Sequence, residues 1–382
     1  MTDPKQETSI YNQADQDGRF RRQTSSFRST ISRSPSAEFP PEKDRYVLYI
    51  TTSCPWAHRT NIVRSLKGLE PFIQLVVLDP RLSPEGWMFS GEFGSATEDP
   101  VYGFRYLKEL YLKADPGYAA KYTVPVLWDK KKETIVNNES SEIIRMMYTE
   151  FDDLLPEQLR EINKPNGGLY PEKLRNEIDE MNEWIYQTVN NGVYKTGFAT
   201  TQEAYDENVY PLFASLDRLE RHLGEPGHGP YLFGEHITDA DVRLYPTIVR
   251  FDVSYHHTFK CNLRMIRHDY PRIDRWLRTL YWDESARTNG GAFGKTTDFI
   301  AVSHGTLLHP LLALPLPRIL PWSFGIKDWV YECIEHMSQR SGLICIQFKT
   351  GYLQSHNRRL GIPFTILPAG PMPHILPRID KA

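Results

Sequence analysis

One cysteine lies where the local sequence could lower the pKa of its thiol. Cys54 follows a β-rich run at residues 46–51 and directly precedes Pro55, a residue favoured at the first position of a helix. Residues 56–67 have the apolar spacing of a helix, which predicts Cys54 at its N-cap. Unpaired backbone N–H groups and the positive end of the helix dipole favour a thiolate there. The predicted chemistry is nucleophilic attack by sulfur.

The residues after Cys54 indicate a site with a single thiol. Redox sites of the thioredoxin type carry a second cysteine three residues after the first, and that position is Ala57 here. A disulfide formed by Cys54 must therefore be resolved by a thiol from elsewhere, for which glutathione is the obvious donor. The alternative is a buried and inert Cys54, because free cysteine also packs as a small hydrophobic residue.

The composition limits the classes of function. A chain of 382 residues with 40% apolar and 12% aromatic residues suggests two domains with sizeable cores. The formal net charge of −3 argues against electrostatic binding of nucleic acid, and no apolar run is suited to crossing a membrane. No secretion signal opens the chain, so a reduced, cytoplasmic protein without a metal is expected. The cysteines lack zinc or disulfide spacing: Cys54, Cys261, Cys333 and Cys345.

The order of predicted elements indicates two domains of different class. Residues 1–40 are rich in Ser, Arg, Gln and Asp, and we expect a mobile, irregular arm that could dock on the body. Residues 41–150 have the order βαβαββα, which is the order of a thioredoxin-like domain in the α/β class. A linker at 151–170 contains several prolines and glycines. Residues 171–300 have helical spacing of apolar residues throughout, which predicts an all-α domain.

This organisation resembles the glutathione transferase superfamily. Several blocks in the same order further resemble its Xi class, the glutathionyl-hydroquinone reductases, which are related to the omega class. The resemblance covers about residues 18–300 and resumes near residue 348. The blocks are SCPWAHR around Cys54, GWMF at Trp87, TVPV at Pro125, NNESSEI at Glu139, NGVYKTGF at Tyr194 and RFDVSYHHTFKCN from Arg250.

The resemblance implies a glutathione site beside Cys54. Pro125 would be the cis-proline that faces the cysteine in this fold, and Val124 would pair antiparallel with the cysteinyl backbone of glutathione. The residues alone favour a trans bond, because only about 5–6% of X–Pro bonds in folded proteins are cis. The cis assignment therefore depends on the family.

The resemblance also implies contacts for both ends of glutathione. Ser140 and the free N–H groups of a helix start would bind the γ-glutamyl carboxylate, and Glu139 would bind the ammonium group. Trp87 would cover the tripeptide backbone, and Lys121 would meet the glycyl carboxylate. Each residue has an ordinary alternative: an N-cap at 139–140, a loop anchor at Trp87 and a solvated lysine at 121.

Three tyrosines would complete the site. Tyr194 resembles the family's proton donor and acceptor toward an aromatic substrate, a role suited to a phenol with a pKa near 10. Tyr255 and Tyr352 match positions that help to lower the pKa of the cysteine. The alternative for each is an aromatic core residue, in a chain with 21 tyrosines.

The implied activity is glutathione-dependent reduction. The Cys54 thiolate would attack the glutathionyl sulfur of an S-glutathionyl-hydroquinone, and the hydroquinone would leave with a proton supplied through Tyr194. A second glutathione would then resolve the mixed disulfide on Cys54 and release glutathione disulfide. Alternatives are an omega-like thioltransferase or dehydroascorbate reductase, a conjugating transferase without a covalent intermediate, and a non-catalytic interaction module. The family also implies a homodimer formed through the helical domains.

The chain departs from the family pattern after Asp298. Residues 301–346 interrupt the pattern, and residues 347–382, with Tyr352, resume it as a predicted C-terminal helix and tail that pack back on the body. The interrupting piece has an apolar run that is too short and too often broken by proline to span a bilayer. A gene-model error and a genuine surface insertion both fit this piece. Whether Tyr352 reaches the site depends on which explanation holds.

Overall fold

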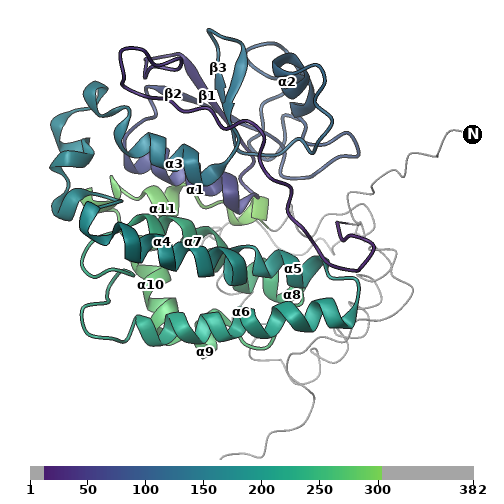
Figure 1. Ribbon diagram of the computed structural model, residues 1–382, viewed down its shortest axis with the longest axis vertical. Coiled ribbons are helices and arrows are strands. Elements are labelled where there is room, and N and C mark those ends of the chain that lie inside the picture. Colours follow the sequence, from purple (N-terminus) through teal and green to yellow (C-terminus); the bar gives the residue numbers. More distant parts are fainter. Residues whose placement is uncertain (1–12, 303–382) are drawn as a thin grey trace, which may run out of the picture.

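The computed structural model describes residues 13–302, which form a sheet domain beside a helical domain (Figure 1). The segment predicted as an insertion lies outside the described residues except at its first two positions. The C-terminal segment 347–382 and Tyr352 lie wholly outside them, so those predictions stay predictions. Among residues 13–302, no helix is both long and apolar enough to span a lipid bilayer.

A four-stranded mixed sheet forms the centre of the first domain. Its strand order is β2-β1-β3-β4, with β1 parallel to β2 and antiparallel to β3, and with β3 antiparallel to β4. Every residue of the central strand β1 is buried, as its apolar and aromatic sequence requires. The strands are β1 (Tyr46–Ile50), β2 (Ile73–Val77), β3 (Val126–Asp129) and β4 (Thr134–Asn137).

Three helices complete the predicted order βαβαββα and confirm the thioredoxin-like fold. They are α1 (Pro55–Leu66), α2 (Leu107–Ala114) and α3 (Ser140–Thr149). Helix α1 begins with Pro55 and buries the four apolar residues on its inner face: Ala57, Ile62, Val63 and Leu66. Helix α1 contacts α3 on one side and the helical domain on the other, so its N-terminal end lies where the two domains meet (Figure 1).

The second domain is helical, as predicted. Its α-helices are α4 (Arg175–Ile185), α5 (Gly192–Phe198), α6 (Gln202–His222), α7 (Asp239–Arg250), α8 (His256–Thr258), α9 (Ile266–Asp269), α10 (Pro271–Trp282) and α11 (Ala292–Lys295). Two π-helical turns, η6 (Tyr186–Asn190) and η7 (Phe251–Tyr255), extend α4 and α7. Shorter 3₁₀ turns are η1 (Asp152–Leu154), η2 (Glu157–Leu159), η3 (Glu161–Asn163), η4 (Pro165–Gly167), η5 (Glu172–Leu174) and η8 (Ala286–Thr288).

The N-terminal arm lies along both domains. Residues 13–39 contain neither a helix nor a strand, and Figure 1 shows this purple segment passing from the sheet domain to the vicinity of α5. The arm covers the outer edge of β4, because Ser29 N donates to Val136 O at 2.9 Å and Asn138 N donates to Phe27 O at 3.1 Å. Farther toward the N-terminus, Arg19 pairs with Glu207 of α6 at 2.6 Å.

Helix α7 is fixed at its start by a buried carboxylate. Asp241 and Thr238 form a capping box, in which Asp241 Oδ2 accepts from the backbone and the hydroxyl of Thr238, both at 2.8 Å. The other oxygen, Oδ1, accepts from Leu232 N at 3.0 Å and from Trp276 Nε1 at 2.8 Å. Asp241 is fully buried, so this side chain joins α7, α10 and the loop before α7.

We expect the Asp241→Ala variant to be much less stable than the wild type. The substitution leaves three buried N–H donors without an acceptor, which should lower the free energy of unfolding by about 3–4 kcal/mol. Urea denaturation of both proteins measures the difference. The control is Asp217→Ala, which removes an ion pair whose side chains are 41% and 48% exposed; it should change stability by less than about 1 kcal/mol. Equal effects of the two substitutions would contradict this account of α7.

Candidate active site

Cys54 lies at the N-cap of α1, with the extended backbone angles φ −79° and ψ 121°. Its thiol donates to the carbonyl of Val124 at 3.8 Å, and the Val124–Pro125 peptide bond is cis. The structure therefore brings the predicted cysteine, the cis-proline and the residue before it together. Their arrangement places the sulfur beside a backbone segment that enters β3.

Opposing effects act on the pKa of Cys54. Burial raises the pKa of the Cys54 thiol, while the backbone N–H groups of Ala57 and Trp56 lower it. The positive charges of Arg250 and Arg22 lower this pKa further, yet the net direction is upward. The groups expected to favour the thiolate are thus in place, and desolvation outweighs them.

Arg250 attaches the loop before Cys54 to the helical domain. This arginine is the last residue of α7 and is 2% exposed. Its Nη2 donates to Thr52 O at 2.8 Å and its Nε donates to Ser53 O at 3.2 Å. Its Nη1 bonds to His58 Nδ1 and to Pro246 O, both at 2.9 Å. A single guanidinium therefore fixes the backbone on the N-terminal side of the cysteine.

His58 supports this arginine and is not positioned as a general base. Burial lowers the pKa of His58 well below its ordinary value, so the ring is neutral. With Arg250 donating to Nδ1, the proton is on Nε2, which lies 3.0 Å from the hydroxyl of Thr296. Both ring nitrogens are therefore engaged within the protein.

Tyr194 and Tyr255 meet beside the cysteine. Tyr194 belongs to α5 and Tyr255 to η7, and their ring centroids are 6.0 Å apart. Burial raises the pKa of both tyrosines, and a negative charge on Cys54 raises both further. Both phenols are therefore protonated at neutral pH and can donate. The hydroxyl of Tyr255 is buried and makes no hydrogen bond of ordinary length, but it faces Tyr194, and their interaction raises the pKa of Tyr255 and lowers that of Tyr194.

The start of α3 carries the two residues predicted for the γ-glutamyl group. Glu139 is the N-cap, and its Oε1 accepts from Ser141 N at 3.1 Å. The hydroxyl of Ser140 is buried and has no hydrogen-bond partner. An unpaired hydroxyl at a helix N-terminus is suited to bind a carboxylate.

The other two predicted glutathione contacts are engaged elsewhere in the protein. Trp87 is half-buried in the loop between β2 and α2, and its carbonyl accepts from Leu107 N at 2.9 Å. Lys121 Nζ donates to Gln13 Oε1 of the arm at 2.7 Å. Neither side chain is hydrogen-bonded to Cys54 in the described part of the chain, so their roles stay predictions.

Comparison with known proteins places the chain in a family. The models of the glutathione S-transferase N-terminal and C-terminal domains match residues 53–150 and 202–279. The glutathione S-transferase omega-like 2 of Schizosaccharomyces pombe is 52% identical over 318 residues, which cover 82% of this chain and 97% of that protein. The crystal structure of the Xi transferase of Phanerochaete chrysosporium superposes with a TM-score of 0.70 at 49% identity, covering 80% of this chain and 100% of that one.

The chain belongs to the Xi class of the glutathione S-transferases. A further relative is the glutathionyl-hydroquinone reductase YqjG of Escherichia coli, which is 50% identical over 69% of this chain and 79% of its own length. The glutathione-bound structure of YqjG superposes with a TM-score of 0.66 at 46% identity, over 76% of this chain and 89% of that one.

Two arginines of this Xi-class transferase are functional candidates that the sequence did not reveal. Arg250 appeared there only as the first residue of a family block. Arg22 appeared only among the arginines of the arm, but its guanidinium lies 4.5 Å from the ring centroid of Trp56 and 4.7 Å from that of Tyr194. Its position in FRRQTSSFR gives no local signal for such a contact, because the contact joins segments far apart in the sequence.

Two cavities flank the transferase site without containing Cys54. A cavity of about 500 Å³ begins at Glu139 and is lined by residues of α1, α3, α4, η6 and α7. A cavity of about 620 Å³ lies on the other side of α7, among α10, α11 and the segment 296–300. The first of these is continuous with the start of α3, so it adjoins the predicted γ-glutamyl site.

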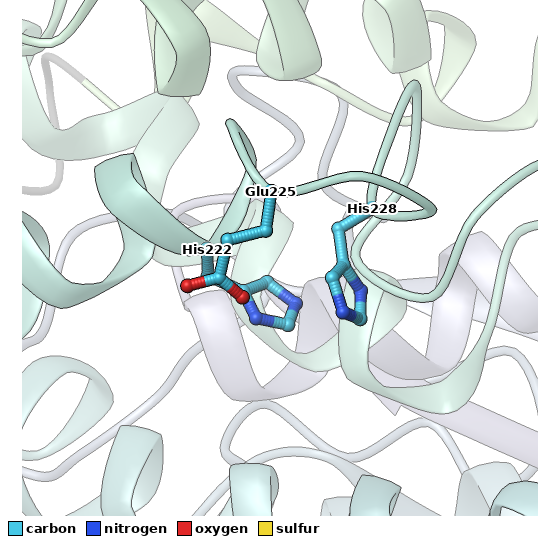
Figure 2. Close-up of side chains that lie close together, drawn as sticks. All are labelled: His222, Glu225 and His228. Atoms are coloured by element: carbon cyan, nitrogen blue, oxygen red, sulfur yellow. The ribbon is translucent and has the colours of Figure 1, made fainter.

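A polar group outside the site lies on the connection between α6 and α7 (Figure 2). One possible ligand atom from each of His222, Glu225 and His228 lies within 4.8 Å of the others, so this group could hold a metal ion. However, His222 Nε2 and His228 Nδ1 bond to the Leu232 carbonyl at 2.7 and 3.1 Å. These two hydrogen bonds hold the loop after α6 and already account for the histidine pair. The prediction that the protein needs no metal stays a prediction.

We expect the Arg250→Met substitution to destabilise the transferase. The carbonyls of Thr52 and Ser53 and the His58 ring lose their charged donor in a buried region, which should lower the free energy of unfolding by about 3 kcal/mol. Guanidinium chloride denaturation measures this loss. The matched control is Arg278→Met on α10, whose side chain is 54% exposed; it should cost less than about 1 kcal/mol. A stable Arg250→Met protein would refute the bridging role.

Proposed function

We propose that this chain is a glutathionyl-hydroquinone reductase that removes glutathione from S-glutathionyl-hydroquinones through a mixed disulfide on Cys54. The proposal rests on the position of Cys54 at a helix start, opposite a cis-proline and beside two protonated tyrosines. It is supported by the 50% identity to YqjG, which is named for this activity.

Glutathione is proposed to bind across the start of α3 and the segment before β3. The backbone of Val124 pairs with the cysteinyl residue, and the unpaired hydroxyl of Ser140 meets the γ-glutamyl carboxylate. Glu139 binds the ammonium group, Trp87 covers the backbone and Lys121 meets the glycyl carboxylate. A glutathione-bound structure of YqjG supports the binding of glutathione as such.

The reaction has two half-reactions. In the first, Tyr194 acts as proton acceptor and donor and moves a proton from a hydroquinone hydroxyl to the ring carbon that carries the sulfur. The Cys54 thiolate then attacks the glutathionyl sulfur, and the electron pair of the broken bond between sulfur and carbon restores the aromatic ring as a phenolate, which takes a proton from water. In the second, a glutathione thiolate attacks the glutathionyl sulfur of the mixed disulfide. Glutathione disulfide leaves and the Cys54 thiolate is restored. Glutathione is therefore the reductant, and the hydroquinone is the reduced product.

The proposed roles of the tyrosines follow from their protonation. Because burial raises the pKa of Tyr194, this phenol keeps its proton at neutral pH and can give it up to the ring carbon of the substrate. The buried hydroxyl of Tyr255 interacts with Tyr194 and can donate to an oxygen of the substrate or to the sulfur of Cys54. Tyr352 keeps its family-based assignment as a third member of this group.

An omega-like activity is the second candidate. The Schizosaccharomyces pombe relative is named omega-like, and a thioltransferase or dehydroascorbate reductase would use the same cysteine. Parallel assays with glutathionyl-menadiol, dehydroascorbate and hydroxyethyl disulfide separate the activities. The reductase proposal expects the highest kcat/KM with glutathionyl-menadiol.

We further propose that the protein is a cytoplasmic homodimer that associates through its helical domains. The homodimer follows from the family resemblance, and the cytoplasmic location follows from the cysteine pattern and the lack of a secretion signal. Light scattering coupled to gel filtration tests the homodimer, with a dimer mass expected and a monomer mass contradicting it.

We expect the Cys54→Ser variant to lose reductase activity, because a serine hydroxyl cannot form the mixed disulfide. Turnover of glutathionyl-menadiol should fall to the uncatalysed rate, while Tyr194→Phe should lower kcat by about 100-fold or more through the lost proton donor. The matched control is Cys261→Ala, which removes the other cysteine of residues 13–302, a buried one, and should keep the activity. Undiminished turnover by Cys54→Ser would refute the assignment.

The pH dependence of the reaction follows from the direction of the pKa of Cys54. Burial raises this pKa, so only a small fraction of the thiol is ionised near pH 7, and that fraction grows as the pH rises. We expect kcat/KM for glutathionyl-menadiol to increase by about tenfold per pH unit between roughly pH 6 and 8. A flat profile over this range would show that the thiol is already ionised below pH 6 and would contradict the upward shift.

A further inference from the structure

We propose that Arg22, supplied by the N-terminal arm, binds an anionic oxygen of the substrate in the active site. The proposal extends the proposed function and rests on it. Two sources carry the required chemistry: a carboxylate of the glutathionyl group and the phenolate oxygen of the hydroquinone.

The arm is attached to the body of the protein on both sides of Arg22. On the C-terminal side, Gln23 Oε1 accepts from Lys121 N at 2.9 Å, and the hydroxyl of Ser25 donates to Glu139 Oε2 at 3.1 Å. On the N-terminal side, Arg19 pairs with Glu207 of α6. The arm therefore contacts Lys121 and Glu139, two residues assigned to glutathione, immediately beside Arg22.

The guanidinium of Arg22 lies between aromatic rings of both domains. It is 4.5 Å from the ring centroid of Trp56, two residues after Cys54, and 4.7 Å from that of Tyr194. Its Nε donates to Asn191 Oδ1 at 2.9 Å, which fixes the plane of the fork. Cation–π contacts and this hydrogen bond thus orient a planar cation next to the nucleophile and the proton donor.

A second nitrogen of this guanidinium, Nη2, lacks a partner. Nη2 of Arg22 is buried and makes no hydrogen bond. Within residues 13–302, the arginines of the arm that form ion pairs are Arg19, Arg21, Arg28 and Arg33, and no carboxylate lies within 4.0 Å of Arg22. A buried guanidinium N–H without an acceptor is costly, and this group is suited to an anionic oxygen from a bound molecule.

The charge of Arg22 also acts on the reacting groups. Burial raises the pKa of Cys54 and of Tyr194, and the positive charge of Arg22 lowers each of them in part. The other charge that lowers the pKa of both groups is that of Arg250, each of whose three nitrogens already has an acceptor within the protein. Arg22 is thus the arginine at Cys54 with a donor to spare.

The test compares Arg22→Met and Arg22→Lys with the matched control Arg21→Met in the full-length protein. Arg21 is the exposed neighbour and pairs with Asp15 and Asp17 of the arm. We expect Arg22→Met to lower kcat/KM for glutathionyl-menadiol by about 10- to 100-fold, because a hydrogen bond to an anion is lost. Arg22→Lys keeps the positive charge but lacks the planar guanidinium, so its kcat/KM should lie between those of Arg22→Met and the wild type. The kcat/KM of Arg21→Met should match that of the wild type. Thermal melting of each variant checks that the fold is kept.

Calorimetric titration with glutathione distinguishes the two sources of the anion. A weaker glutathione affinity of Arg22→Met indicates a carboxylate, whereas an unchanged affinity with a lower kcat indicates the phenolate oxygen. If Arg22→Met kept both turnover and glutathione affinity within twofold of the wild type, the proposal would be overturned. A change in the rate at which iodoacetamide alkylates Cys54 would not rescue it, because that rate reports the reactivity of the thiol and not binding by Arg22. If the wild type bound glutathione but did not turn over the conjugate, the reductase function would fail. A weaker glutathione affinity of Arg22→Met would then still support contact between Arg22 and a carboxylate, and an unchanged affinity would overturn the proposal.

Discussion

The site depends on one buried arginine that joins the two domains. Arg250 ends α7 and donates to the two carbonyls that precede Cys54, at Thr52 and Ser53. Helix α7 is itself fixed by the capping box at Asp241, so the helical domain determines where the nucleophile lies. Because every nitrogen of this guanidinium donates within the protein, its desolvation is compensated by hydrogen bonds rather than by a paired carboxylate.

The remaining site residues come from three segments that meet at this junction (Figure 1). The sheet domain supplies Cys54 and Ser140, the helical domain supplies Tyr194, and the arm supplies Arg22. Burial at the junction opposes ionisation of the thiol and keeps the phenol protonated. The same desolvation also strengthens any hydrogen bond made there by the unpaired hydroxyl and guanidinium groups, which is how such a site can bind a charged tripeptide.

The sequence predicted the local features well and the long-range contacts poorly. The N-cap position of Cys54 and helix α1 follow from Pro55 and the apolar spacing after it, which are local signals. The cis bond at Pro125 was predictable only through the family, since a proline alone favours trans. The contacts of Arg22 and Arg250 were missed, because an arginine is ordinarily a surface residue and its burial is decided by segments far away in the chain.

The most direct test of the account is to look for the covalent intermediate. Wild-type protein is mixed with an equimolar amount of glutathionyl-menadiol in the absence of free glutathione, and intact-mass and peptide spectra are recorded. The account predicts one glutathione in disulfide linkage to Cys54 and an equal amount of released menadiol, with the adduct removed by added glutathione. Consumption of the conjugate without any adduct on Cys54, or an adduct on another residue, would contradict it.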